Sequence, residues 1–308
     1  IFTAPALASS FFNIGSIAGG VVFGWLIDPA FGRQALIGLA LGTLVGGFLQ
    51  FAIQLPSLRK AGFHFRPDFQ WKDPGISQIL TIMLPSVIAA SAVQINVLVN
   101  SRFASYAGAE AVTWLNSAFR LMQLPIGVFG VAVATITLPV VSRIAADTDS
   151  SRFGPTLGRA LRLAVFLTLP SAVGLWFLAE PVIGLIYEHG HFVANDTRQT
   201  ALALQFYAAG LVAYSCIKVL SPAFYAIDKK WTPMTVSFGA VALNLLLNYV
   251  FMFHLGLGHK GLALSTSICA LLNFGVLYLL MRPAARTLET ARLAGTLVRC
   301  CQIGRAHV

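Results

Sequence analysis

Residues Ala111–Arg143, AVTWLNSAFRLMQLPIGVFGVAVATITLPVVSR, decide how the rest of the chain is interpreted. The stretch is apolar enough to cross a membrane as a helix, yet it carries Arg120 nine residues from its start. At about 1.5 Å per residue this is roughly 13 Å, close to the middle of a hydrocarbon core about 30 Å thick. A charge at that depth costs at least about 2.5–3.5 kcal/mol unless it meets water, a partner or a ligand. The sequence therefore predicts a membrane helix that must accommodate an arginine.

The polar residues around Arg120 follow the period of a helix, so they share one narrow face. They are Thr113, Asn116, Arg120, Gln123 and Gly127. Just past this face, Pro125 and Gly127 weaken the backbone and predict a bend. Two interpretations stay open: the face borders a water-filled cavity, or Arg120 pairs with an acid on a neighbouring helix. We favour the cavity, because the other apolar runs offer no obvious acidic partner.

The composition is that of an integral membrane protein. Of 308 residues, 57% are hydrophobic and only 10% are charged, whereas soluble domains carry about 25% charged residues. The apolar runs are long enough for helices rather than barrel strands. The net charge of +10 lies mainly in short loops, which is the pattern of topology signals and not of a nucleic-acid site. The four cysteines show neither zinc-ligand nor redox spacing.

Eight apolar runs predict an all-α membrane protein with about eight transmembrane helices. They are residues 4–26, 35–55, 76–102, 112–142, 160–180, 198–226, 233–254 and 261–281. Fifteen of the 21 lysines and arginines lie in one set of connecting segments, and four lie in the opposite set. The positive-inside rule places the richer set in the cytoplasm and the segment Glu188–Asp196 outside.

A weak internal repeat suggests two parallel six-helix bundles. In the first pair of runs, the run that begins near Pro5 leads to Gly32 before the second run, and in the last pair the run that begins at Pro233 leads to Gly258 before the second run. The two separations are similar, and the two pairs lie six runs apart. We therefore expect a fragment that lacks four helices upstream. The expected domains are 1–60, the last two helices of an N-terminal lobe; 61–75, a cytoplasmic linker; 76–285, a C-terminal six-helix lobe; and 286–308, a truncated cytoplasmic tail. Within the tail, 302–308 (QIGRAHV) resembles a translated sequencing adapter and is set aside.

The first two runs are rich in glycines spaced by four residues, such as Gly15 and Gly19, and Gly38 and Gly42. Small residues at this spacing let helix backbones approach closely. We expect these two helices to pack against each other.

Other polar residues lie within the runs. Gln94, Asn96 and Asn100 occupy the outer half of 76–102, where they either line the cavity of Arg120 or bond helix to helix. Lys218 either lines the inner cavity or snorkels to the interface, the second being slightly favoured. His189 and His191 lack a third ligand for a metal.

Catalytic motifs are missing from the sequence. There is no nucleophile elbow, phosphate-binding loop, zinc-binding HExxH or paired-carboxylate site. We therefore expect neither an enzyme nor a resident cofactor or metal.

Several motifs resemble the MurJ (MviN) lipid II flippases. Gln54–Lys60 (QLPSLRK) resembles the end of their sixth helix, Phe119–Pro125 (FRLMQLP) their eighth helix, and Glu188–Phe192 (EHGHF) an outer-loop element. Lys218–Tyr225 (KVLSPAFY), followed by Asp228 and Thr232-Pro233, is the most specific match. The resemblance extends to about Arg282. It implies the fold of the multidrug/oligosaccharidyl-lipid/polysaccharide (MOP) exporters, with two six-helix lobes around a central cavity.

The resemblance also implies a function. The family moves the lipid-linked peptidoglycan precursor, lipid II, from the inner to the outer leaflet of the bacterial cytoplasmic membrane by alternating access. Arg120 matches an essential arginine of its cationic cavity, and arginine suits a pyrophosphate because its planar fork makes two hydrogen bonds. The expected substrate-binding residues are Arg120, Thr113, Asn116, Gln123, Gln94, Asn96, Asn100 and Lys218. The expected partners are lipid II and membrane lipids, without nucleic acid, and the protein is expected to be a monomer.

Two departures and three alternatives remain. Gln123 and Phe119 stand where the family often has acids, which puts any ion coupling through those positions in doubt.

The alternatives are another MOP exporter, either an O-antigen or polysaccharide lipid flippase or a drug/cation antiporter, and a membrane-embedded transferase acting on lipid-linked sugars. An antiporter would be expected to carry an intramembrane acid, and a transferase a catalytic acid or histidine at a membrane surface.

Overall fold

The computed structural model describes residues 3–60, 62, 73–108, 110–147, 150–229, 231–285 and 295. Most of the expected linker 61–75, nearly all of the tail from residue 286 and the adapter-like residues 302–308 lie outside the described residues. The described residues form helices joined by short connections. The chain divides into two compact units, unit 1 (Ile1–Ser77) and unit 2 (Gln78–Val308).

Unit 1 is built on two long helices in close contact. Its elements are α1 (Thr3–Ile27), α2 (Ala35–Ala52) and the short α3 (Leu55–Lys60). A Cβ atom placed on Gly15 would lie 2.8 Å from Cα of Gly46, and one on Gly19 would lie 2.9 Å from Cα of Gly42. No side chain fits at such a contact, so the glycines let the two backbones touch. The predicted close packing of these helices is confirmed.

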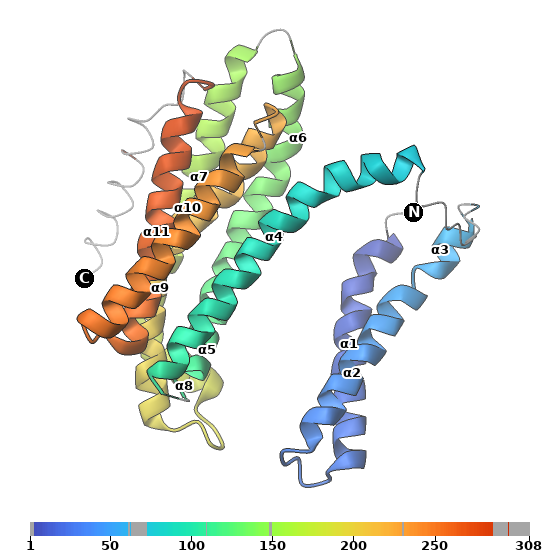
Figure 1. The fold of residues 1–308 in the computed structure, drawn as a ribbon, viewed down its shortest axis with the longest axis vertical. Coiled ribbons are helices and arrows are strands. Elements are labelled where there is room, and N and C mark those ends of the chain that lie inside the picture. The colour runs from blue at the N-terminus through green and yellow to red at the C-terminus, as the bar shows by residue number, and fades with distance from the viewer. Residues whose placement is uncertain are drawn as a thin grey trace. The chain divides into compact units, whose positions relative to one another are not determined.

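Unit 2 contains the remaining long helices, which lie side by side in Figure 1. They are α4 (Pro74–Tyr106), whose first turn precedes the unit boundary, α5 (Ala111–Pro125), the π-helix η1 (Ile126–Val131), α6 (Ala132–Ala146), the 3₁₀ turn η2 (Ser150–Arg152), α7 (Phe153–Phe177), α8 (Ala179–Tyr187), α9 (Ala194–Ala226), α10 (Trp231–Tyr249), the π-helix η3 (Val250–His254) and α11 (Gly258–Met281).

Seven helical segments in the described chain are long and apolar enough to cross a membrane. They correspond to seven of the eight expected runs, with α5, η1 and α6 forming one continuous span over Ala111–Ala146. The eighth run, 76–102, forms the 33-residue helix α4, which is not among the seven. Helix α7 begins at Phe153, seven residues before the expected start at residue 160, so Arg159 lies in a helix and not in a loop. Membrane helices continue past the hydrocarbon boundary, and apolar content alone does not mark where they begin.

At Pro125 and Gly127, where the sequence predicted a weakened backbone, the helix changes from α-helical to π-helical hydrogen bonding. Pro125 ends α5, and the backbone then follows a π-helix from Ile126 to Val131 before α6 begins. Proline has no N–H to donate to the turn before it, and insertion of a wider turn is one way a helix absorbs this loss. The span therefore consists of two α-helical halves joined by a π-helical segment.

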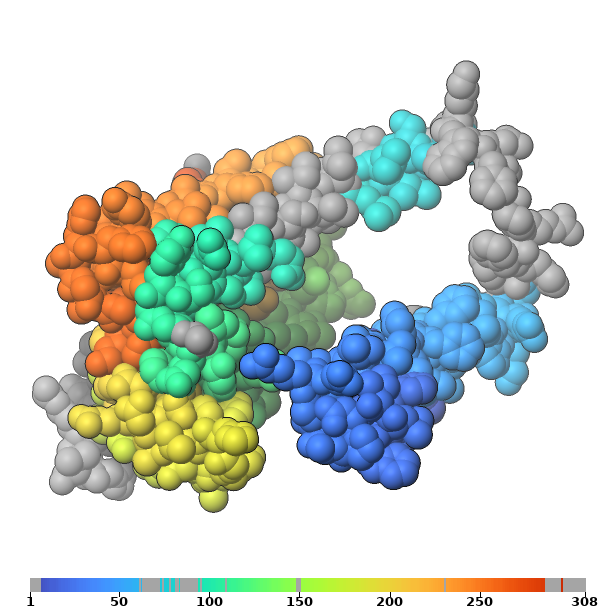
Figure 2. All heavy atoms as spheres, turned by 60° about the horizontal axis from the view of Figure 1, so that its bottom comes forward, coloured from blue at the N-terminus to red at the C-terminus, as the bar shows by residue number. Residues whose placement is uncertain are grey.

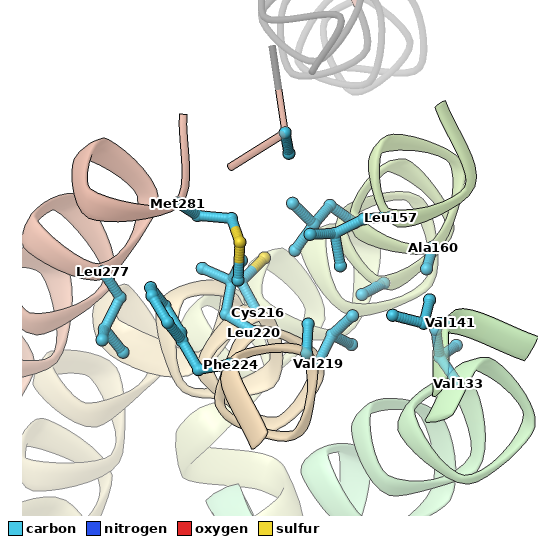
Figure 3. Close-up of a cluster of buried hydrophobic side chains, with 14 of the residues drawn as sticks. Val133, Val141, Leu157, Ala160, Cys216, Val219, Leu220, Phe224, Leu277 and Met281 are labelled. Atoms are coloured by element: carbon cyan, nitrogen blue, oxygen red, sulfur yellow. The ribbon is translucent and has the colours of Figure 1, made fainter. Parts of the chain in front are cut away.

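Helix α9 organises the core of unit 2, and it is the most buried of the seven spans. Towards its C-terminal end, Leu220 and Phe224 pack with Leu157 of α7 and Met281 of α11 in one cluster (Figure 3). Towards its N-terminal end, a second cluster joins α9 to α5 and α8, with residues that include Leu115, Met122, Ile183, Leu204 and Leu211. These contacts fix the rotation of α5, because its apolar side faces α9.

Candidate functional site

Helix α5 presents a polar face away from the core. Ala118 and Met122 are 0% exposed and Leu115 is 6% exposed, so these residues mark the buried side. The opposite side consists of the exposed residues Thr113, Asn116, Arg120 and Gln123. The periodicity prediction of a single polar face is therefore confirmed for α5.

Arg120 makes no hydrogen bond or ion pair with any residue that the structure describes. It belongs to the apolar span Ala111–Ala146, at about the middle of its first half. A guanidinium carries five N–H donors and strongly favours an anionic acceptor. The exposed face of α5 therefore carries a cation that has no anionic partner among the described residues of the span.

Three of the expected site residues meet at one cavity. Asn96 and Asn100 of α4 and Asn116 of α5 line a space of about 240 Å³ that is also bounded by α9, α10 and α11. The other five expected residues do not line this cavity, and each of them is exposed. These five are Thr113, Arg120, Gln123, Gln94 and Lys218.

A hydrogen-bonded network borders the cavity through Asn100 and Asn244. Asn248 Nδ2 donates to Oδ1 of Asn100 over 2.6 Å and to Oδ1 of Asn244 over 3.1 Å. The Ser265 hydroxyl donates to Oδ1 of Asn248 and accepts from Asn244 Nδ2 over 3.3 Å. Asn100 therefore bonds α4 to α10, which is one of the two roles that the sequence left open. The cavity that Asn100 lines does not include Arg120, so a shared cavity stays a prediction.

Two amide oxygens at the cavity have no hydrogen-bond partner among the residues that the structure describes. Oδ1 of Asn96 and Oδ1 of Asn273 are buried atoms without a hydrogen bond, and both residues line the cavity. Part of the remaining wall is aromatic, since the rings of Phe119 and Tyr207 meet edge to face with centroids 5.5 Å apart. Among the described lining residues there is no lysine, arginine, aspartate or glutamate. The cavity is therefore mainly apolar, with a few uncharged polar groups in its wall.

The end of unit 2 that is predicted to face outside is held by polar contacts of Trp114. Its Nε1–H donates to Oδ1 of Asp196 over 2.8 Å, and its ring meets that of His259 at 5.0 Å. Nε2–H of His259 donates to the carbonyl of Gln199 over 3.2 Å. Figure 2 shows this end, where the region of α8 (yellow) lies next to the α4–α5 junction (green) and the start of α11 (orange).

The outer-loop motif also contributes to this end. The Thr197 hydroxyl donates to Oε2 of Glu188 over 2.7 Å, which gives the glutamate a local structural contact. Among the described residues, His189 and His191 belong to no group of three or more His, Cys, Asp or Glu side chains that could hold a metal ion.

Most of the cavity wall was not predicted from the sequence. Asn244 and Asn273 line the cavity from within apolar runs and were not singled out. Asn244 and its hydrogen-bond partner Asn248 repeat the four-residue spacing of Asn96 and Asn100. That spacing was an available signal. Tyr207 gave none, because an isolated tyrosine in a membrane helix is as typical of the core as of a site.

Comparison with protein families gives a match over almost the whole chain. The family model described as "Lipid II flippase MurJ" matches residues 1–304. A probable lipid II flippase MurJ of Vibrio cholerae is 38% identical over 258 residues, which is 84% of this chain and 49% of the relative. The lipid II flippase MurJ of Burkholderia cenocepacia is 36% identical over 285 residues, which is 91% of this chain and 54% of the relative. The chain spans about half the length of these curated relatives.

Solved structures give the same family and a wider fold group. A lipid II flippase MurJ in an inward closed conformation superposes with a TM-score of 0.77 at 29% identity, covering 96% of this chain and 59% of that one. An outward-facing multidrug resistance MATE family transporter of the MOP superfamily superposes with a TM-score of 0.63 at 18% identity, covering 89% of this chain and 62% of that one. The second match concerns the fold alone, and it extends the likeness to MOP transporters in general.

Proposed function

The chain belongs to the MurJ lipid II flippase family, and from this premise we propose that it carries part of the substrate path by which lipid-linked peptidoglycan precursor passes from the inner to the outer leaflet. It is a multi-pass protein of the bacterial inner membrane, with the helical fold of the MOP exporters. The activity belongs to a complete protein, because the chain spans about half of its relatives. That activity is transport and not catalysis of a reaction.

The observation that supports this proposal most directly is the environment of the Arg120 side chain. It lies within an apolar span, its side chain is exposed, and it has no partner in the described part of the chain. An unpaired charge at membrane depth is tolerated where it faces water or an anionic ligand. Arg120 therefore faces the central cavity of the complete protein and binds the pyrophosphate of the precursor.

Arginine suits this task for a geometric reason. Its planar guanidinium can donate two parallel hydrogen bonds to neighbouring oxygens, whereas the lysine ammonium acts as a point charge. Thr113, Asn116 and Gln123 extend the exposed face with neutral groups that can bond the flanking parts of the headgroup. Gln94 and Lys218 are exposed on α4 and α9 and complete the set of residues that we assign to the substrate path.

The alternative of a drug/cation antiporter lacks support among the residues described. The seven apolar spans of the described chain contain one acidic residue, Asp196. It lies in the first turn of α9, where it accepts hydrogen bonds from the Trp114 indole and from the backbone N–H of Val193. An acid at a helix end with two partners is not poised to exchange a cation. Arg120 is a cation without a partner in the described part of the spans, and it calls for an anionic substrate.

The test is lipid transport by a completed protein, in which this chain replaces the matching segment of the Burkholderia cenocepacia relative. After reconstitution into vesicles, we expect Arg120→Ala to reduce flipping of lipid II to the background rate. Arg120→Lys should retain less than about a tenth of the activity, because the two-point contact with phosphate is lost. Arg198→Ala is the matched control: this arginine is also exposed, but it lies near the start of α9.

Each variant must first be shown to insert and to elute as a single species. Normal flipping by Arg120→Ala would mean that Arg120 is structural. Equal activity of the lysine variant would leave the positive charge as the operative property and would refute two-point binding.

A further inference from the structure

We propose that the cavity between α4, α5, α9, α10 and α11 is a subsite for one uncharged sugar unit of the headgroup, next to the pyrophosphate at Arg120. The proposal rests on the proposed function and extends it from the charged to the neutral part of the substrate. Its basis is the chemistry, position and size of the cavity.

The lining selects against charge. Its polar groups are amides and hydroxyls, and no acidic or basic side chain lies among them. A charged ligand group would be removed from water here without a counter-charge, which costs far more than burying a hydroxyl that finds a hydrogen bond. A neutral ligand with many hydrogen-bonding groups fits this wall.

Two acceptors in the wall lack a donor in the described part of the chain. Oδ1 of Asn96 on α4 and Oδ1 of Asn273 on α11 are buried and make no hydrogen bond there. Most buried polar atoms in proteins are paired, so an unpaired one needs an explanation such as a bound ligand or water. The hydroxyl and acetamido N–H groups of an N-acetylated sugar are donors of the required kind.

The rest of the wall suits the faces of a sugar ring. Phe119 and Tyr207 form an aromatic pair, and Leu115, Ile217 and Leu262 add aliphatic surface. Ligand pockets typically combine such apolar walls with a few placed polar groups that fix orientation. A sugar matches both, because its C–H faces are apolar and its hydroxyl edge is polar.

Position links the cavity to the pyrophosphate. Asn116 lines the cavity and also belongs to the exposed face that carries Arg120. The two residues are one helical turn apart, about 6 Å along the axis of α5. A sugar attached directly to the pyrophosphate can therefore enter the cavity while the phosphates remain at Arg120.

The volume limits what enters. A cavity of about 150 Å³ can hold benzene, and a water molecule takes about 30 Å³. The 240 Å³ here suffices for one pyranose ring but not for a disaccharide with its peptide. The remainder of the headgroup stays in the central cavity.

The test compares two lipids that differ by one sugar: undecaprenyl pyrophosphate and undecaprenyl-pyrophosphoryl-N-acetylglucosamine. The 308-residue chain in nanodiscs is the receptor, and native mass spectrometry gives both dissociation constants. We expect the sugar to tighten binding by about tenfold or more.

Ala240→Phe, which places a ring in the cavity, should abolish this difference while leaving affinity for the bare lipid unchanged. Ala242→Phe is the matched control, since it makes the same substitution two residues on at an exposed position of α10.

A second variant does not depend on filling the cavity. Asn273→Leu removes an acceptor that makes no hydrogen bond with the described part of the chain, so we expect the fold to be kept and the gain from the sugar to fall severalfold. Equal binding of the two lipids by the wild-type chain, or an undiminished difference in Ala240→Phe, would show that the cavity holds water only and would overturn the subsite alone. If the wild-type chain binds neither lipid, the proposed function falls with it.

Discussion

The side chain of Asn248 makes three hydrogen bonds to other side chains. It is 0% exposed and donates to both Asn100 and Asn244, while the Ser265 hydroxyl donates to its oxygen. Its partners come from α4, from its own helix and from α11. One side chain therefore links three helices, and this link also fixes the orientation of the amides at the cavity.

We predict that Asn248→Leu destabilises the chain, because the amide oxygens of Asn100 and Asn244 lose a donor, while the Ser265 hydroxyl keeps the carbonyl of Leu262 as an acceptor. Each unsatisfied group costs about 1–3 kcal/mol in water-soluble proteins, and hydrogen bonds between membrane helices average about 0.6 kcal/mol. We expect a loss of about 1–3 kcal/mol, measured by unfolding in mixed micelles. Asn273→Leu is the control, because its Oδ1 is already unpaired; a loss of equal size there would contradict the network argument.

The exposed face of α5 could be predicted from the sequence, whereas the network of Asn248 could not. The face depends only on the period of a single helix, so Thr113, Asn116, Arg120 and Gln123 were found together. The bond from Asn248 to Asn100 joins residues 148 positions apart. It depends on the rotation and depth of α10 against α4, which no spacing within either helix encodes. The same limit hid Asn273 and Tyr207.

The two-helix contact of unit 1 depends on a row of glycines. Gly42 faces the backbone of Gly20, so even a Cβ at this position would overlap main-chain atoms that have no flexible side chain to move. Gly47, five residues later on α2, has nothing within 4 Å of the corresponding point. The two positions differ only in their side of the helix, which gives a matched pair for substitution.

We predict that Gly42→Ala separates α1 from α2 and destabilises unit 1 by about 1–3 kcal/mol, as overpacking typically does. Gly47→Ala should be neutral or stabilising by up to about 1 kcal/mol, because alanine is the better helix former. Thermal unfolding of both variants, followed by circular dichroism, measures the difference. Equal effects at the two positions would argue against backbone contact.

For the helix Ala111–Ala146, the sequence predicted where the regular α-helical hydrogen bonding is interrupted, but not which backbone geometry replaces it. Proline and glycine mark a loss of hydrogen bonding, while the choice of a π-helical turn over a kink depends on packing of the following half against α7 and α9. Helix ends were displaced by several residues for a related reason. At α7 the helix extends into the polar interface, where apolar content no longer marks it.

For the whole molecule, the distribution of basic residues remains the basis of orientation. We predict that the α6–α7 connection faces the cytoplasm and that Glu188–Asp196 faces outside. With an impermeant thiol reagent added to intact cells, His191→Cys should be labelled and Ser150→Cys should be labelled only after permeabilisation. The native Cys216 and Cys269 are buried and should contribute little background. Cys300 and Cys301 of the tail are replaced by serine in both variants, so that they add no signal after permeabilisation. Labelling of Ser150→Cys from outside would reverse the assigned orientation.

The second prediction at this scale concerns what the 308-residue chain can do alone. Alternating access requires two lobes that rock about a shared site, and the chain covers about half the length of the relatives that it matches. Unit 2 holds Arg120 and the cavity, while unit 1 contributes two long helices. The chain should therefore bind a pyrophosphate lipid without moving it across the bilayer. In cells depleted of their own flippase, we expect the chain to reach the membrane but not to restore growth, whereas the completed protein should restore it. Growth with the 308-residue chain alone would show that transport needs only these helices, and the two-lobe mechanism would then have to be abandoned.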